Sequence, residues 1–151
     1  IFVNELYKQM NGELKDIISF IPNYDADIAK IMVSGSDVWL NTPIVGREAC
    51  GTSGMKACLN SVLPLSTNDG WVNEVNISDF GWLINEDGDI TKNILDILEE
   101  KVLPEFYNDK NSWNERMVKS RKLILDKCST NRMLREYVSK LYRPILLKPY
   151  L

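Results

Sequence analysis

Residues 37–67, DVWLNTPIVGREACGTSGMKACLNSVLPLST, contain two short apolar runs separated by a glycine-rich segment. The runs at 36–41 and 62–67 have the composition of buried strands. Between them the sequence predicts a helix from about Ser53 to Ser61. A buried strand, a helix and a second buried strand in this order predict a crossover unit in a parallel sheet.

The segments before residue 37 extend this alternating pattern. Apolar residues from Phe2 to Met10 have helical spacing, which predicts a helix in the first segment, residues 2–16. Residues 17–22, IISFIP, predict a further buried strand. A short helix is expected over 25–35, with Asp25 as N-cap and Gly35 as its end.

The segments after about residue 85 predict helices only. Residues 90–104 place apolar side chains on one helical face, and Ser112 with Glu115 resembles a capping box. A last helix is expected around Met133–Leu141, and residues 104–112 predict a loop. We therefore expect an α/β fold with a partial Rossmann-like parallel sheet over 1–85, followed by a C-terminal helical segment of the same domain over 86–151.

Composition excludes several classes of protein. The 151 residues are 44% hydrophobic and 26% charged, with a net charge of −3 and no basic run, so neither nucleic acid nor an anionic membrane is an expected partner. No apolar stretch could span a bilayer, and no signal peptide is evident. The chain has no histidine, and its three cysteines form no C-x-x-C pair, so we expect no metal site and a reducing, cytoplasmic location.

The glycine-rich segment predicts an anion site. It follows a strand and opens a helix, where backbone N–H groups and the helix dipole favour phosphate. Gly51 and Gly54 allow a close approach, and Thr52 and Ser53 add hydroxyl donors. A partly desolvated Lys56 near these dipoles could act as a free amine that condenses with an aldehyde. The alternative is a plain loop-to-helix junction, since neither a Walker sequence nor G-x-G-x-x-G is present.

Three further residues, Glu48, Tyr24 and Trp71, have two interpretations each. Glu48 could accept sugar hydroxyls or be an exposed loop acid, and Tyr24 could wall a pocket at a strand end or simply pack. Asp69 with Gly70 indicates a turn. Trp71 could stack on a sugar, although core packing is the default for a tryptophan.

The stretch EACGTSGMKACLNSVLPLSTNDGW, residues 48–71, resembles the pyridoxal-phosphate attachment segment of the α-glucan phosphorylases, the glycogen, starch and maltodextrin phosphorylase family. FIPNYDADIAK and the C-terminal NRMLREYVSKLYRP are similar to other segments of that family. DVWLNTP resembles its short bacterial and archaeal branch in particular.

The resemblance implies a glucosyltransferase with two Rossmann-like domains that converts α-1,4-glucans and inorganic phosphate to glucose 1-phosphate. Lys56 would form an imine with pyridoxal phosphate, Thr52 and Ser53 would hold its phosphate, and Tyr24 would line its pocket. Glu48 and the backbone of Cys50 and Gly51 would bind sugar. Family members are often dimers, so a homo-oligomer is expected.

The sequence departs from the family pattern in three ways. Cys50 replaces the usual serine, which is tolerable if the contact is through backbone, and Ser61 replaces the usual glycine. The family's basic residues for substrate phosphate and its N-terminal domain have no counterpart here. We therefore expect a C-terminal portion that is inactive alone and that self-associates through an exposed sheet edge and apolar face.

Two other functions stay open at this point. A nucleotide-sugar glucosyltransferase of the same architecture would keep the anion site without pyridoxal phosphate. A non-catalytic folded fragment would bind neither cofactor nor sugar.

Overall fold

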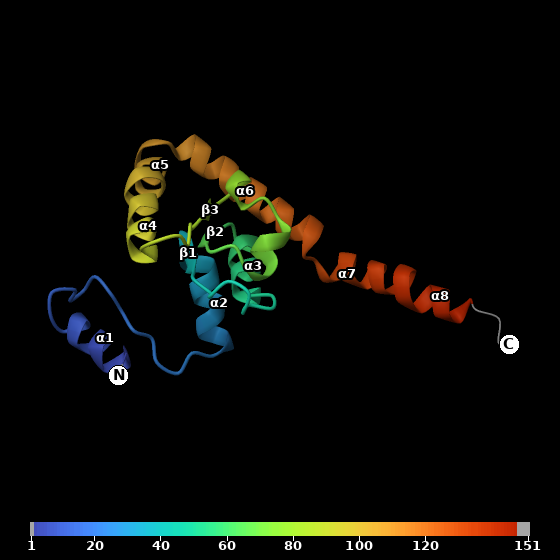
Figure 1. Ribbon diagram of the computed structural model, residues 1–151, viewed down its shortest axis with the longest axis horizontal. Coiled ribbons are helices and arrows are strands. Elements are labelled where there is room, and N and C mark those ends of the chain that lie inside the picture. Colours follow the sequence, from blue (N-terminus) through green and yellow to red (C-terminus); the bar gives the residue numbers. More distant parts are fainter. Residues whose placement is uncertain (1, 148–151) are drawn as a thin grey trace. The chain divides into compact units, whose positions relative to one another are not determined.

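The computed structural model describes residues 2–147 and divides the chain into two compact units, Ile1–Met32 and Val33–Leu151. Figure 1 shows the order of the elements along the chain. The unit boundary falls inside α2 (Ala26–Gly35). The division expected from the sequence, into an α/β part over 1–85 and a helical segment over 86–151, stays a prediction.

The first unit contains α1 (Phe2–Met10) and the start of α2. Both helices were predicted, and Asp25 caps α2 as expected, because its Oδ1 accepts from the amides of Asp27 and Ile28 at 3.0 and 2.9 Å. The strand predicted at 17–22 is wrong: this segment is turn and coil, and Ile17 is 74% exposed. A strand needs a hydrogen-bonded neighbour, and within residues 2–147 this segment has none.

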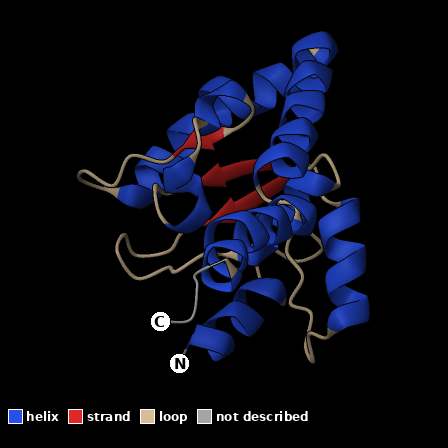
Figure 2. Ribbon diagram, turned by 90° about the vertical axis from the view of Figure 1, so that its right-hand side faces the viewer, coloured by secondary structure: helices blue, strands red, loops and turns tan. Residues whose placement is uncertain are grey.

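The second unit is built on a three-stranded sheet in the order β1–β2–β3. β1 (Val38–Asn41) pairs in parallel with β2 (Leu63–Ser66), which pairs in parallel with β3 (Trp82–Leu83), as Figure 2 shows. β1, β2 and the intervening α3 (Thr52–Leu59) form the predicted crossover unit. β3 was not predicted, because two residues are too short to show a strand periodicity.

Two 3₁₀ turns connect β2 to β3, and a series of helices follows β3. The 3₁₀ turns are η1 (Gly70–Glu74) and η2 (Ile77–Asp79). The predicted helix at 90–104 is α4 (Ile90–Ile97), which continues through a π-turn, η3 (Leu98–Val102), into α5 (Leu103–Asn108). Then come α6 (Lys110–Lys127), α7 (Thr130–Tyr137), the π-turn η4 (Val138–Tyr142) and α8 (Arg143–Leu146).

The loop predicted at 104–112 and the capping box at Ser112 are both wrong. Only Asp109 interrupts the helices in this region. Its Oδ1 accepts from the Ser112 amide at 3.0 Å and its Oδ2 from the Ser112 hydroxyl at 2.7 Å, so Asp109 is the N-cap of α6. These bonds hold the pKa of the Asp109 carboxyl below its usual value, chiefly through the Ser112 amide.

Three buried clusters form the core, and the smallest joins Val33, Ala57 and Val62 with Trp39 of β1. Leu63 and Leu65 of β2 pack with Trp82, Val102 and Trp113, so η3 and the start of α6 cover this side of β2. Another cluster joins α3, η1, η2 and α6 through six fully or nearly fully buried side chains: Cys58, Trp71, Val72, Ile77, Phe80 and Ile124.

Cys58 lies in the cluster that joins α3, η1, η2 and α6. Its side chain has no exposed surface, and burial is the main cause that raises the pKa of its thiol to about 11. Cys50 is exposed and Cys128 is half-buried, and all three cysteines are free.

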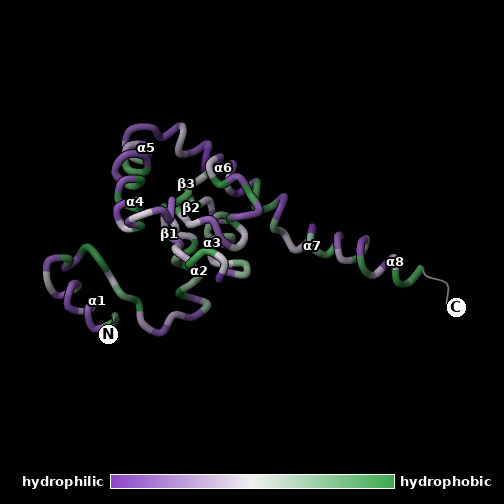
Figure 3. Tube along the Cα trace, in the orientation of Figure 1, coloured by the Kyte–Doolittle hydropathy of each residue, from purple (hydrophilic) through white to green (hydrophobic). Residues whose placement is uncertain are grey.

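The segment α7–η4 is amphipathic and largely exposed. Figure 3 shows hydrophilic and hydrophobic residues alternating along it. Leu134 is 58% exposed, and Tyr137 and Leu141 also present much of their surface to solvent. No helix within residues 2–147 combines the length and the apolar character needed to cross a membrane.

Candidate functional site

The glycine-rich segment lies at the carboxyl edge of the sheet. Because all three strands are parallel, the loops after Asn41, Ser66 and Leu83 leave from this one edge. The loop of residues 42–51 connects β1 to α3, and the turn of residues 67–70 follows β2. Ligands of open α/β sheets bind at such an edge.

The turn after β2 holds the loop after β1. Oδ2 of Asp69 accepts from the amides of Arg47 and Glu48 at 3.1 and 2.8 Å, and Oδ1 accepts from the Gly70 amide at 2.8 Å. The Trp71 amide donates to the carbonyl of Cys50 at 2.9 Å. The predicted turn at 69–70 is thus also a structural clamp on the glycine-rich segment.

Asp69 is stabilised in its charged form by this arrangement. The hydrogen bond from the Glu48 amide, helped by those from Gly70 and Arg47, holds the pKa of the Asp69 carboxyl below its usual value. Sequence reasoning missed this role. The N-D-G signal indicates a turn, but it does not reveal contacts to residues 21 and 22 positions away.

The side chain of Glu48 lies between two glycines. A Cβ on Gly51 would be 3.2 Å from Glu48 Oε1, and a Cβ on Gly70 would be 3.0 Å from Glu48 Cγ. Both glycines have left-handed backbone, with φ of +77° and +55°. Glu48 is half-buried, so its carboxylate is positioned by the backbone while part of it stays accessible.

The N-terminus of α3 presents unpaired amides beside hydroxyl groups. Its N-cap is Gly51, which has no side chain to accept from the first amides of the helix. Thr52 is exposed and Ser53 is half-buried at this end. The donor set therefore fits a phosphate group, which takes several N–H and O–H donors at a helix N-terminus.

Lys56 lies on α3, but not where the sequence suggested. The helix begins at Thr52, so Lys56 is in its second turn, four residues along, on the same face as Thr52. Lys56 is exposed. The partial desolvation expected of it is therefore not provided by the residues that the structure describes.

Tyr24 does not end a strand, since the strand predicted before it is absent. It lies in the coil before Asp25 and α2 and is 57% exposed. Because it belongs to the first unit, its role in a pocket stays a prediction.

Trp71 packs in the core, as its default interpretation predicts. It is 5% exposed and stacks on Phe80 with ring centroids 6.4 Å apart. Its indole edge also lies against Gly54, where a Cβ would be 3.0 Å from Nε1. The absence of a side chain at Gly54 therefore lets Trp71 approach α3 closely.

A cavity of about 430 Å³ adjoins the glycine-rich segment. Ala49, Cys50, Met55 and Trp71 line one part of it, and Cys128 and Arg132 line another. Sequence reasoning did not associate residues near 130 with this segment. No set of three or more cysteine or acidic side chains within residues 2–147 is arranged to hold a metal ion.

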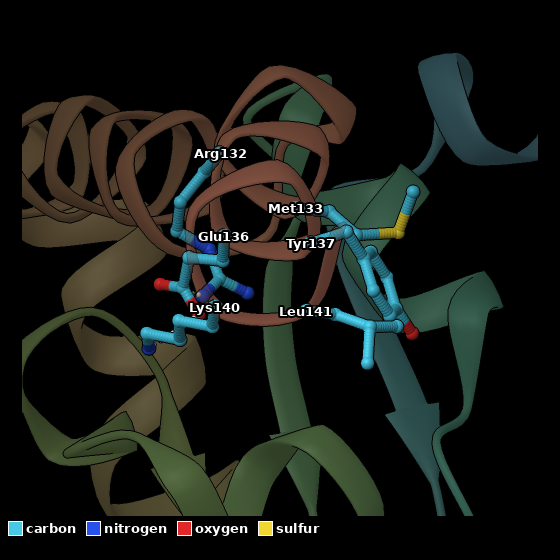
Figure 4. A pocket seen from close by; sticks show the side chains of 6 residues that line it. All are labelled: Arg132, Met133, Glu136, Tyr137, Lys140 and Leu141. Carbon is cyan, nitrogen blue, oxygen red and sulfur yellow. Dashed lines mark hydrogen bonds and ion pairs between the residues drawn. The ribbon is translucent and has the colours of Figure 1, made fainter. Parts of the chain in front are cut away.

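A second hollow of about 420 Å³ lies along α7–η4 and is shown in Figure 4. Glu136 accepts from Arg132 at 2.8 Å and from Lys140 at 3.0 Å. These bonds, that from Lys140 first, hold the pKa of the Glu136 carboxyl below its usual value. Met133, Tyr137 and Leu141 supply its apolar lining.

The fold and the site together define an α/β protein with an uncapped helix N-terminus at the carboxyl edge of a parallel sheet. The sequence model of the carbohydrate phosphorylase family matches residues 3–81. The chain belongs to this family.

Individual relatives extend the similarity over most of the chain. Maltodextrin phosphorylase of Thermococcus litoralis is 38% identical over 96% of this chain and 19% of its own length. Glycogen phosphorylases of Mycobacterium tuberculosis and Aquifex aeolicus are 37% and 40% identical over 87% and 85% of this chain, and over 17% and 20% of their own lengths. The chain thus spans about a fifth of the length of these relatives, which confirm the predicted bacterial and archaeal phosphorylase family.

Proposed function

We propose that the chain supplies the cofactor lysine and part of the sugar site of a pyridoxal-phosphate-dependent α-glucan phosphorylase. The reaction is the phosphorolysis of α-1,4-glucans by inorganic phosphate to glucose 1-phosphate. The observation that supports it most is the uncapped N-terminus of α3, with Lys56 one turn further along the helix. The names of the relatives, which are maltodextrin and glycogen phosphorylases, point to the same activity.

Pyridoxal phosphate fits the residues at the start of α3. The amides of the first turn and the hydroxyls of Thr52 and Ser53 would bind its phosphate, and the exposed amine of Lys56 would bind its aldehyde carbon. Tyr24 would line the pocket. When bound, the cofactor would supply a phosphate that donates and accepts a proton towards the substrate phosphate.

Glu48 would orient the glucose unit. A carboxylate accepts hydrogen bonds from sugar hydroxyls, and this one is fixed between Gly51 and Gly70. The carbonyl of Cys50 already accepts from Trp71, so backbone N–H groups of Cys50 and Gly51 would make the further contacts. Such contacts leave the Cys50 side chain free, which makes cysteine in place of serine tolerable.

The whole protein would be a cytoplasmic homo-oligomer with a two-Rossmann architecture. The parallel sheet described above would then be part of one of its two Rossmann-like domains. This architecture places an active site in a cleft between domains, where glucan and phosphate meet.

The experiment uses the polypeptide that carries this chain, assayed for phosphate-dependent release of glucose 1-phosphate from maltodextrin. We expect activity together with a cofactor absorbance that borohydride fixes on Lys56. Lys56→Ala should lose both, because no other amine lies at this position of α3.

Lys122→Ala, at an exposed lysine of α6, is the matched control and should keep both properties. Full activity in Lys56→Ala would refute the role of Lys56. Glucosyl transfer from a nucleotide sugar without cofactor absorbance would instead indicate the alternative transferase.

A further inference from the structure

We propose that Asp69 is a positioning residue that holds Glu48 and the backbone of residues 47–50 in the arrangement that binds sugar. This inference rests on the proposed function, because it takes Glu48 as a sugar ligand. Asp69 itself contacts no substrate in this proposal and acts through the loop.

The clamp consists of three amides that converge on one carboxylate. Arg47 and Glu48 donate to one oxygen at 3.1 and 2.8 Å, and Gly70 donates to the other at 2.8 Å. Only an ionised carboxylate offers two acceptor oxygens without a donor of its own. Bonds from N–H groups to a charged acceptor are also stronger than neutral ones.

Two further bonds tie the same turn to the same loop. The hydroxyl of Thr67 donates to the carbonyl of Pro43 at 2.9 Å, and the amide of Trp71 donates to the carbonyl of Cys50 at 2.9 Å. Thr67 and Trp71 are both buried, so they form a fixed base. Between these two buried residues, the side chain of Asp69 reaches the part of the loop that contains Glu48.

Besides one turn, in which the Arg47 amide donates to the carbonyl of Ile44 at 3.0 Å, the loop has few other means of holding its shape. Residues 42–51 contain no helix or strand, and most of their side chains are exposed. Glu48 is therefore positioned by its own amide, through Asp69, and by contact of its side chain with Gly51 and Gly70. Loss of the Asp69 bonds would free the amide while leaving the turn attached through Thr67 and Trp71.

The test compares Asp69→Asn and Asp69→Ala with the wild type in the full polypeptide. Asparagine keeps the size of the side chain but has one acceptor oxygen, and its NH₂ would face an amide donor. We expect hydrogen exchange at the amide of Glu48 to accelerate about ten-fold to a hundred-fold. The Arg47 amide also donates to the carbonyl of Ile44 at 3.0 Å and should change less. The KM for glucose 1-phosphate should rise about ten-fold, because a mobile Glu48 binds sugar less well.

Two readouts separate positioning from general stability. The cofactor absorbance at Lys56 and the thermal midpoint of Asp69→Asn should stay close to wild type. Asp126→Asn, an exposed carboxylate on α6, is the matched control and should change none of the measurements.

Unchanged amide exchange in Asp69→Asn would overturn the clamp. Accelerated exchange with an unchanged KM would overturn the positioning role. A wild-type polypeptide that neither binds pyridoxal phosphate nor uses glucose 1-phosphate would refute the proposed function and the sugar role with it, whereas amide exchange would still decide the clamp by itself.

Discussion

Gly70 combines two constraints that no other residue type meets easily. Its φ of +55° is left-handed, and a Cβ would stand 2.6 Å from the carbonyl oxygen of Cys50. Gly46 shares the first constraint, with φ of +84°, but has open space around it. A side chain at Gly46 would therefore meet only the conformational cost of a left-handed backbone, whereas one at Gly70 would meet that cost and a steric clash as well.

We expect Gly70→Ala to lower the free energy of unfolding by about 3 kcal/mol and Gly46→Ala by about 1 kcal/mol. The left-handed conformation costs a non-glycine residue roughly 1–2 kcal/mol, and a clash with packed backbone adds to it. Urea denaturation of both variants measures the difference. Equal losses would show that the Cys50 carbonyl moves aside without cost.

The sequence predicted individual residues best where a local pattern carried the information. Glu48, Thr52, Ser53 and Lys56 were chosen from one continuous stretch, which the structure shows as a loop followed by the first two turns of α3, and their roles stay predictions. Asp69 was interpreted only as a turn residue. Its partners are distant in the chain, and their proximity follows from the pairing of β1 with β2.

At the scale of elements, the junction between α5 and α6 depends on a single side chain. Asp109 ends one helix and caps the next through the amide and hydroxyl of Ser112. Glu115, which the sequence suggested as part of a capping box, instead lies 3.7 Å from Lys119 on an exposed surface. The cap therefore lies three residues before the predicted position.

We expect Asp109→Ala to destabilise the protein by about 1 kcal/mol, the usual cost of losing an N-cap carboxylate. Glu115→Ala should change stability by less than about 0.5 kcal/mol, because exposed ion pairs contribute little. Chemical denaturation of the two variants tests this contrast. A larger loss of stability in Glu115→Ala than in Asp109→Ala would instead support a capping box of Ser112 with Glu115.

The elements that were predicted correctly have strong local signals, and those that were missed do not. β1 and β2 are short apolar runs with a helix between them, and both are strands. Residues 17–22 have the same composition but are coil, because strand formation depends on a partner that composition does not reveal. The α5–α6 junction was predicted as a loop because its polar residues resemble one.

At the scale of the molecule, the exposed apolar surface of α7–η4 is the feature that most needs a covering partner. Leu134, Tyr137 and Leu141 each leave about half of their surface exposed. Contiguous apolar surface of this kind favours association in water. This surface supports the self-association expected from the sequence, which stays a prediction.

We expect the isolated chain to self-associate, and Leu134→Glu combined with Leu141→Glu to shift it towards monomer, because a charge on each apolar position opposes burial. Ser139→Glu, on the same π-turn, is the control and should leave the molar mass unchanged. Light scattering across a concentration series measures both. A monomeric wild-type chain at every concentration would contradict this expectation.

The rate at which the buried thiol of Cys58 is alkylated reports on the packing of α3 against α6. Alkylating reagents attack the thiolate, which burial suppresses at Cys58, whereas Cys50 is open to solvent. Cys50, in the loop beside the glycines, should thus be alkylated first. Alkylation of Cys58 should follow only when α3, the helix that carries Lys56, separates from α6. One reaction followed over time therefore separates labelling of the accessible loop from labelling that requires loss of the helix packing beneath it.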